Sequence, residues 1–408
     1  MEDLRLGSNY VKLWTASAIS NLGDGVRWVA LPLLAVTLTR DPARVAAIDL
    51  ASSLPWFLFA LPAGALVDRL DRRKVMVVAN VFRTAVMITL AVLVLTDNSS
   101  LLVLYALAFC LGAAETMFDN AAQAIMPRVV DHSLLEKANG RLAAAELTAN
   151  QFIGPPVGGL LFAAMVALPF MLDAGSFAIS AILIFLIRGA FSNPRDKALP
   201  ATRLRHEISE GLRWLWGHRL LRSMAAYVGL MNMMSTACFS IFVLFAVQIL
   251  DLSEAGYGLL LSSMAIGSLV GGLTAARVAK RIGGGRTIFI GLVLSMVSYL
   301  LMGASSNPFT VGAGAALLGL PVTSWNVITV SMRQRLIPDR LLGRVNSVYR
   351  LLAWGTMPIG AVLGGVLGRV YGLRAPFFVA AALHVVLAIL ALKLFSNAAL
   401  ERARSEGS

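Results

Sequence analysis

The most constraining feature of this chain is a series of apolar runs, each long enough to cross a lipid bilayer, that recurs along the 408 residues. A transmembrane helix needs about twenty consecutive, mainly apolar residues. Such runs occupy 11–38, 46–67, 75–95, 101–126, 140–165, 167–187, 220–249, 256–278, 287–305, 309–331, 341–370 and 376–395. Only 14% of the residues are charged, whereas soluble domains average about 25%. We therefore predict an all-α membrane protein with twelve transmembrane helices.

The basic residues between these runs predict the orientation of the chain. Of the 35 Lys and Arg residues, 29 lie on one side of the predicted membrane and four on the other. Because cytoplasmic loops carry the excess of Lys and Arg, both termini are expected in the cytoplasm, with the protein in the cell (inner) membrane. The net charge of +13 is explained by these loops, so no nucleic-acid partner is expected.

The longest polar connection runs from residue 189 to residue 219 and divides the apolar runs into two sets of six. Leu204, Ile208, Leu212 and Leu215 recur in it at helical spacing, which predicts an amphipathic helix on the cytoplasmic surface. The expected domains are an N-terminal six-helix bundle at 1–188, this linker at 189–219 and a C-terminal six-helix bundle at 220–408.

The two halves repeat each other. Leu134, Leu135 and Asn139 recur as Leu341, Leu342 and Asn346, and Ile153, Gly154, Gly158 and Gly159 recur as Ile359, Gly360, Gly364 and Gly365. A parallel repeat of two pseudo-symmetric six-helix bundles is the architecture of transporters whose substrate site lies at the midplane between the halves. A scaffold or a receptor would not explain such a duplication.

The segment from Gly64 to Lys74 reads GALVDRLDRRK and joins the second and third predicted spans. It resembles the loop signature of the major facilitator superfamily, with Asp71 where that signature usually has Gly. The resemblance covers nearly the whole chain and implies the major facilitator fold. It also implies a cytoplasmic gating role for Gly64, Asp68, Arg69, Arg72 and Arg73. The alternative is that the Arg cluster only sets the membrane orientation.

A second resemblance concerns the fifth span, which reads GPPVGG from Gly154 to Gly159. It is similar to an element of the exporting, proton-antiport branches of the superfamily. The runs at 9–14, 21–24 and 30–34 resemble the group that includes siderophore and macrolide exporters. We expect Gly154, Pro155, Gly158 and Gly159 to kink this helix and to allow close packing. Simple small-residue packing is the alternative.

Ionisable residues inside the spans of the first half are functional candidates, because charge is costly there. The acids Asp24, Glu115, Asp119 and Glu146 are candidates for proton coupling, with Glu115 the first choice, and Arg27 and Arg83 are candidates for ion pairs with them. The alternative is a static polar network in which the arginines neutralise the acids. The spans of the second half contain no acidic residue, so any proton relay is expected in the first half.

The substrate is expected to meet polar, aromatic and polarisable side chains. The candidate residues are Asn150, Asn232, Phe239, Trp325, Asn326, Arg350 and Trp354, with a role in the bundle core as the alternative for most of them.

These observations predict a secondary active transporter that exports amphiphilic small molecules, such as drugs or secondary metabolites, by proton antiport and alternating access. A lipid or lysolipid flippase and an uptake permease of the same fold are the alternatives. A membrane-embedded enzyme is the least favoured, because the chain has no H-E-x-x-H, no G-x-S-x-G and no ATP-binding loop. We expect no cofactor and no metal, and partners limited to substrate, protons and membrane lipids for a monomer.

Overall fold

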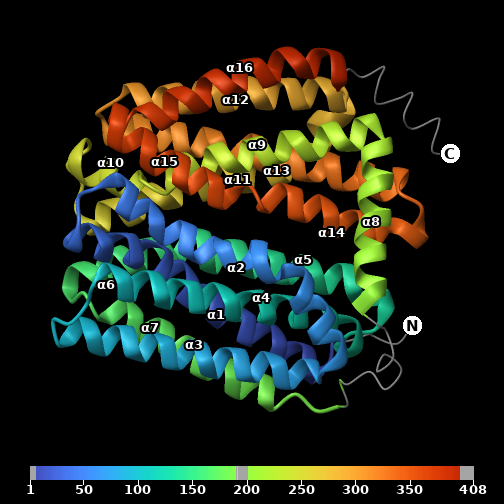
Figure 1. The fold of residues 1–408 in the computed structure, drawn as a ribbon, viewed down its shortest axis with the longest axis horizontal. Coiled ribbons are helices and arrows are strands. Elements are labelled where there is room, and N and C mark those ends of the chain that lie inside the picture. The colour runs from blue at the N-terminus through green and yellow to red at the C-terminus, as the bar shows by residue number, and fades with distance from the viewer. Residues whose placement is uncertain (1–5, 190, 192–200, 396–408) are drawn as a thin grey trace. The chain divides into compact units, whose positions relative to one another are not determined.

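The computed structural model describes residues 6–189, 191 and 201–395, and this part of the chain is built from helices. Their bounds are α1 Gly7–Leu38, α2 Pro42–Arg69, α3 Arg72–Leu95, α4 Leu101–Val129, η1 His132–Leu134, α5 Leu135–Glu146, η2 Leu147–Ile153, α6 Gly154–Ala164, α7 Leu168–Phe185, α8 Ala201–Gly217, α9 Arg219–Phe239, α10 Phe242–Gln248, α11 Glu254–Ile282, α12 Gly284–Ala304, α13 Pro308–Leu336, α14 Asp339–Trp354, α15 Met357–Tyr371 and α16 Ala375–Leu394 (Figure 1). The all-α prediction is confirmed.

Nine helical segments of the described residues are long and apolar enough to cross a membrane. Twelve spans agree with this fold but remain a prediction. Three predicted spans are interrupted helices in the structure: α5–η2–α6, α9–α10 and α14–α15. The first and the last of these breaks fall in the two segments of the sequence repeat, next to the matching pairs Ile153–Gly154 and Ile359–Gly360.

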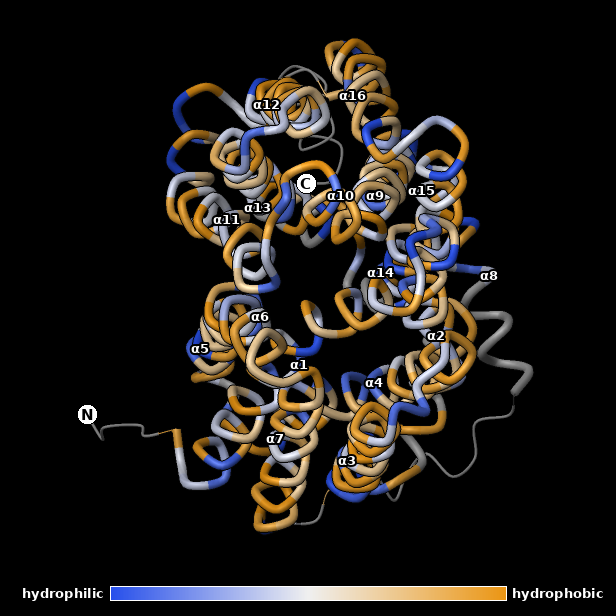
Figure 2. The backbone as a smooth tube through the Cα atoms, turned by 90° about the vertical axis from the view of Figure 1, so that its left-hand side faces the viewer, coloured by the Kyte–Doolittle hydropathy of each residue, from blue (hydrophilic) through white to orange (hydrophobic). Residues whose placement is uncertain are grey.

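The outer surface of the helices is apolar, which is expected of a protein whose solvent is lipid. On α3 the exposed residues Val78, Val81, Phe82, Ile88 and Val92 follow one another at helical spacing, and Val78 is 67% exposed. Figure 2 shows hydrophobic residues along most of α7 and α16 as well. Such a surface has no stable place in water, so the chain is a multi-pass membrane protein.

The described chain packs as two compact units. The first takes in 6–40, 48–189 and 252–262, and the second takes in 41–47, 201–251 and 263–395. In the first unit α7 packs along both α1 and α3, and α1 also packs along α6. Its apolar core includes Tyr10, Leu13, Phe118 and Ile125. These contacts place α1 in the middle of the first unit.

In the second unit α12 packs along α13 and α16, and α9 packs along α15. The core of this unit includes Tyr227, Trp325 and Phe395.

The predicted linker helix is present as α8, which lies crosswise to α9 and packs on α14 (Figure 1). Glu210 of α8 forms an ion pair with Arg344 of α14. The side chains of 201–208 lie outside the described residues.

Candidate functional site

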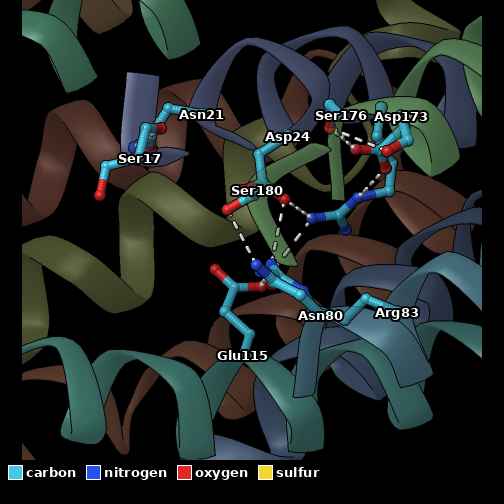
Figure 3. A network of polar contacts seen from close by, with 10 residues as sticks. Ser17, Asn21, Asp24, Asn80, Arg83, Glu115, Asp173, Ser176 and Ser180 are labelled. Carbon is cyan, nitrogen blue, oxygen red and sulfur yellow. Dashed lines mark hydrogen bonds and ion pairs between the residues drawn. The ribbon is translucent and has the colours of Figure 1, made fainter. Parts of the chain in front are cut away.

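A cluster of buried charges lies in the first unit, and α1 provides its centre. Asp24 and Arg27 are one turn apart on α1 and form an ion pair. Arg83 of α3 places Nη2 3.1 Å from Oδ1 of Asp24 and 3.6 Å from Oε2 of Glu115 on α4. Arg27 Nη2 lies 3.9 Å from the same Glu115 oxygen. Each of these two carboxylates is therefore shared by both arginines (Figure 3).

A third acid in this charge cluster, Asp173 of α7, was missed in the sequence analysis. Its Oδ2 lies 3.0 Å from Nε of Arg27, and its side chain is 0% exposed. The available signal was an isolated acid within the apolar run MLDAGSFAIS, which alone marks a functional candidate in a membrane helix. The cluster thus holds three carboxylates against two guanidinium groups.

Aromatic rings hold the more deeply buried arginine. The guanidinium carbon of Arg83 lies 4.1 Å from the ring centre of Phe177 and 5.7 Å from that of Phe118. A cation over an aromatic face is stabilised by the quadrupole of the ring, and more strongly where water is excluded. One turn before Arg83, Asn80 donates to the Ser180 hydroxyl at 2.9 Å. These contacts fix α3 against α7.

The other two predicted acids lie outside these ion pairs. Asp119 is one turn beyond Glu115 on α4, and Glu146 is exposed at the end of α5. Glu115 itself has a side chain that is 35% exposed, against 15% for Asp24. Of the three acids that the arginines hold, Glu115 has the most exposed side chain.

The predicted kink in the fifth span is a turn of π-helix rather than a bend at the prolines. The segment η2 precedes α6, and Pro155 and Pro156 lie in the first turn of α6. Pro156 has no N–H to donate to the carbonyl of Phe152, and the Ser262 hydroxyl donates to that carbonyl at 3.2 Å. The prolines therefore begin a new helix, and a side chain replaces the missing backbone hydrogen bond.

Asn150 lies in η2, where its backbone packs against α1. A Cβ atom at Gly25 would lie 2.3 Å from the carbonyl O of Asn150. Only a glycine permits this approach, which brings η2 beside the turn of α1 that carries Asp24. π-Helical turns occur often at functional sites.

The loop that resembles the superfamily signature is described in part. The side chains of Asp68 and Arg69 lie outside the described residues. Arg72 is buried at the start of α3, and Nη1 of Arg73 donates to the carbonyl O of Ile187 at 2.7 Å, beyond the end of α7. Asp71, the departure from the signature, caps α3 by accepting from the backbone N of Lys74. The Asp71 side chain accepts a hydrogen bond that a Gly could not accept, which explains why Asp is suited to this position where the family usually has Gly.

The remaining substrate candidates lie in the second unit. Trp325 is 5% exposed and packs in the core with Tyr227 and Phe395, which favours the core role that the sequence left open for it. Asn232 donates to the carbonyl O of Ala353 at 2.8 Å, so it joins α9 to α14.

The other four candidates of the second unit are at least partly exposed. They are Phe239, Asn326, Arg350 and Trp354. Phe239 meets Phe242 edge to face at 5.2 Å, and the Arg350 guanidinium lies 4.9 Å from the ring centre of Trp354. Trp354 and Asn326 are exposed. Among the described residues there is no group of three His, Cys, Asp or Glu side chains that could hold a metal.

Comparison with known proteins gives matches along nearly the whole chain. A family model described as "Transmembrane secretion effector" matches residues 7–406. The multidrug efflux pump Tap of Mycolicibacterium fortuitum is 26% identical over 392 residues, which cover 93% of this chain and 94% of the relative. The enterobactin exporter EntS of Escherichia coli O1:K1 / APEC is 25% identical and covers 87% of this chain and 84% of its own.

Solved structures of transporters have the same fold. The nucleoside transporter NupG has a TM-score of 0.73 at 13% identity, covering 96% of this chain and 100% of its own. A bacterial homologue of the iron transporter ferroportin, in an inward-facing state, has a TM-score of 0.75 at 16% identity, covering 95% of this chain and 98% of its own.

Proposed function

The chain belongs to the transmembrane secretion effector family of major facilitator transporters, and we propose that it exports amphiphilic small molecules in exchange for protons. The family and its relatives are transporters, so we also propose that the chain has no enzymatic activity. The positive-inside count supports a cell-membrane location with both termini in the cytoplasm.

The observation that carries proton exchange is the imbalance in the charge cluster, where three acids contact two arginines. In a low-dielectric interior an unpaired carboxylate is strongly disfavoured, so one of the acids gains stability by taking up a proton. Glu115 is the candidate for this acid because its side chain is the most exposed of the three. A proton can reach it from water while Arg27 and Arg83 remain paired with Asp24 and Asp173.

Export of amphiphilic compounds is supported by the names of the relatives, a multidrug efflux pump and an enterobactin exporter. It is supported also by the composition of the candidate substrate residues, which are three aromatic residues, three asparagines and one arginine. A sugar would require many more convergent hydrogen-bonding groups.

The proposal is tested with ethidium as the probe, in cells and in inside-out membrane vesicles. We expect wild-type protein to lower ethidium accumulation in cells and to take ethidium up into inside-out vesicles, and an uncoupler to abolish both effects. Glu115→Gln should lose this response, because it removes the group that exchanges the proton. Asp97→Asn is the matched control, since Asp97 is an exposed loop acid with a positive φ of 54° that Asn also tolerates.

Two results would contradict the proposal. Uptake of ethidium into cells would reverse the direction of transport. Unchanged, uncoupler-sensitive export after joint neutralisation of Glu115, Asp119 and Glu146 would remove these acids from the coupling mechanism.

A further inference from the structure

Asp173 differs from the other acids of the charge cluster in its burial and in its partner. Asp24 and Glu115 each contact both arginines, whereas the ion pair of Asp173 is with Arg27, through Nε rather than Nη2. Its side chain is 0% exposed, against 35% for Glu115. Rapid proton exchange requires access to water, so the two acids are suited to different tasks.

The local sequence is built to hold the Asp173 carboxylate at this position. A Cβ atom at residue 23 would lie 2.4 Å from Oδ1 of Asp173 and 2.1 Å from Oγ of Ser176, so only Gly23 leaves room for them. Gly23 precedes Arg27 by four residues, which places both on one face of α1. Ser176 donates to the carbonyl O of Asp173 at 2.8 Å, which anchors its hydroxyl within α7.

The charged groups around Asp173 come from two of the three helices packed against α7. They are Arg27 and Asp24 on α1 and Arg83 on α3, while α6 has no titratable side chain. Glu115 of α4 meets the same arginines through their Nη2 atoms. With Asp24 and Asp173 ionised, the two arginines are balanced, and Glu115 is the acid in excess among the three that contact them. Asp119 of α4 and Glu146 of α5 also interact with Glu115, and as like charges they repel its ionised form.

We propose that Asp173 is a positioning residue: as the fully buried counter-ion 3.0 Å from Nε of Arg27 it neutralises that arginine, so that Glu115 can gain and lose a proton without leaving an unpaired cation. This inference depends on the proposed proton exchange. Its consequence is that the protonation of Glu115 is set by a carboxylate on another helix whose side chain is fully buried.

The test is an infrared titration of the purified full-length protein, which follows the absorption of protonated carboxyl groups as pH changes and needs no substrate. Wild-type protein should show a titrating carboxyl group that Glu115→Gln removes. In Asp173→Asn the midpoint of this titration should move to lower pH by about one unit or more, because Arg27 then lacks its counter-ion and a nearby cation favours the ionised form of Glu115. Ser180→Ala is the control: it removes a buried hydrogen bond from the same helix and should leave the midpoint unchanged.

A second pair of variants keeps the inference testable if Asp173→Asn fails to fold. Arg27→Gln should move the midpoint to higher pH, because one cation then faces three acids. Adding Asp173→Asn to Arg27→Gln should return it toward the wild-type value, because the double variant removes a balanced pair.

The possible failures are distinguishable. No titrating carboxyl group in wild-type protein would refute proton exchange at this site. A group that titrates and is removed by Glu115→Gln, but with the same midpoint in Asp173→Asn, would refute only the positioning role. A group removed by Asp173→Asn itself would make Asp173 the proton carrier and overturn the assignment.

Discussion

At the scale of the residue, carboxylates in this chain have different tasks that follow from their surroundings. Asp71 is a helix cap, Asp173 is a buried counter-ion and Glu115 is partly open to water. Asp68 lies in the last turn of α2 within the loop signature, and the resemblance to the superfamily implies a gating contact for it.

We predict that Asp68→Asn inserts and folds like wild-type protein but transports about tenfold more slowly. The reason is the loss of a charge-assisted hydrogen bond, which contributes about 1.5–3 kcal/mol. Ethidium efflux rates at matched expression provide the measurement. Asp71→Asn is the control, since Asn caps a helix as well as Asp does. Equal rates for wild-type protein and Asp68→Asn would leave the loop with only a topogenic role.

At the scale of the element, the interrupted fifth span decides where the charges of α1 lie. The break consists of the π-helical turn η2, followed by Pro155 and Pro156 in the first turn of α6, and its position beside Asp24 is secured by a glycine contact. A Cβ at Gly25 would meet only backbone atoms of Asn150, which cannot move aside as the tip of a side chain could. The contact between α1 and η2 is therefore rigid.

We predict that Gly25→Ala destabilises the protein by about 1–3 kcal/mol, the usual cost of overpacking. The added methyl group would push α1 and η2 apart and displace Asp24, so we also expect export to be reduced. Gly175→Ala in α7 is the matched control. Nothing lies within 4 Å of its Cβ, so this change should be neutral or stabilising by about 0.5–1 kcal/mol. Thermal unfolding of both variants in detergent measures the difference. Equal melting temperatures would show that α1 and η2 adapt.

At the scale of the whole molecule, ionisable and apolar groups are divided between the two halves of the sequence. The acids within spans belong to the first half, and the second half supplies most of the aromatic candidates for substrate contact. Such a division suits a transporter in which one half carries the coupling ion and the other adapts to varied apolar substrates.

We predict that overproduction of the protein raises resistance to at least one hydrophobic antibiotic, because few polar groups constrain the substrate. The measurement is susceptibility to a panel of lipophilic and hydrophilic compounds, with the Glu115→Gln variant as the control for expression. Saturable, high-affinity uptake of a hydrophilic nutrient, with no change in resistance to the lipophilic compounds, would contradict this expectation.

The all-α membrane class, the repeat and the family were predicted from the sequence alone, because apolar run length, loop charge and short signatures are local properties of the chain. It also identified Asp24, Arg27, Arg83 and Glu115 as candidates, since any charge inside a membrane helix is conspicuous. Spacing on one helix can suggest a pair such as Asp24 with Arg27.

Which charges share partners depends on how the helices pack, and this became visible in the three-dimensional structure. The meeting of α1, α3, α4 and α7 joins residues that are up to 149 positions apart, from Asp24 to Asp173, and no local pattern encodes such a meeting. For the same reason the core position of Trp325 and the hydrogen bond from Ser262 to the Phe152 carbonyl could not be predicted. Both depend on packing between helices that are distant in the chain.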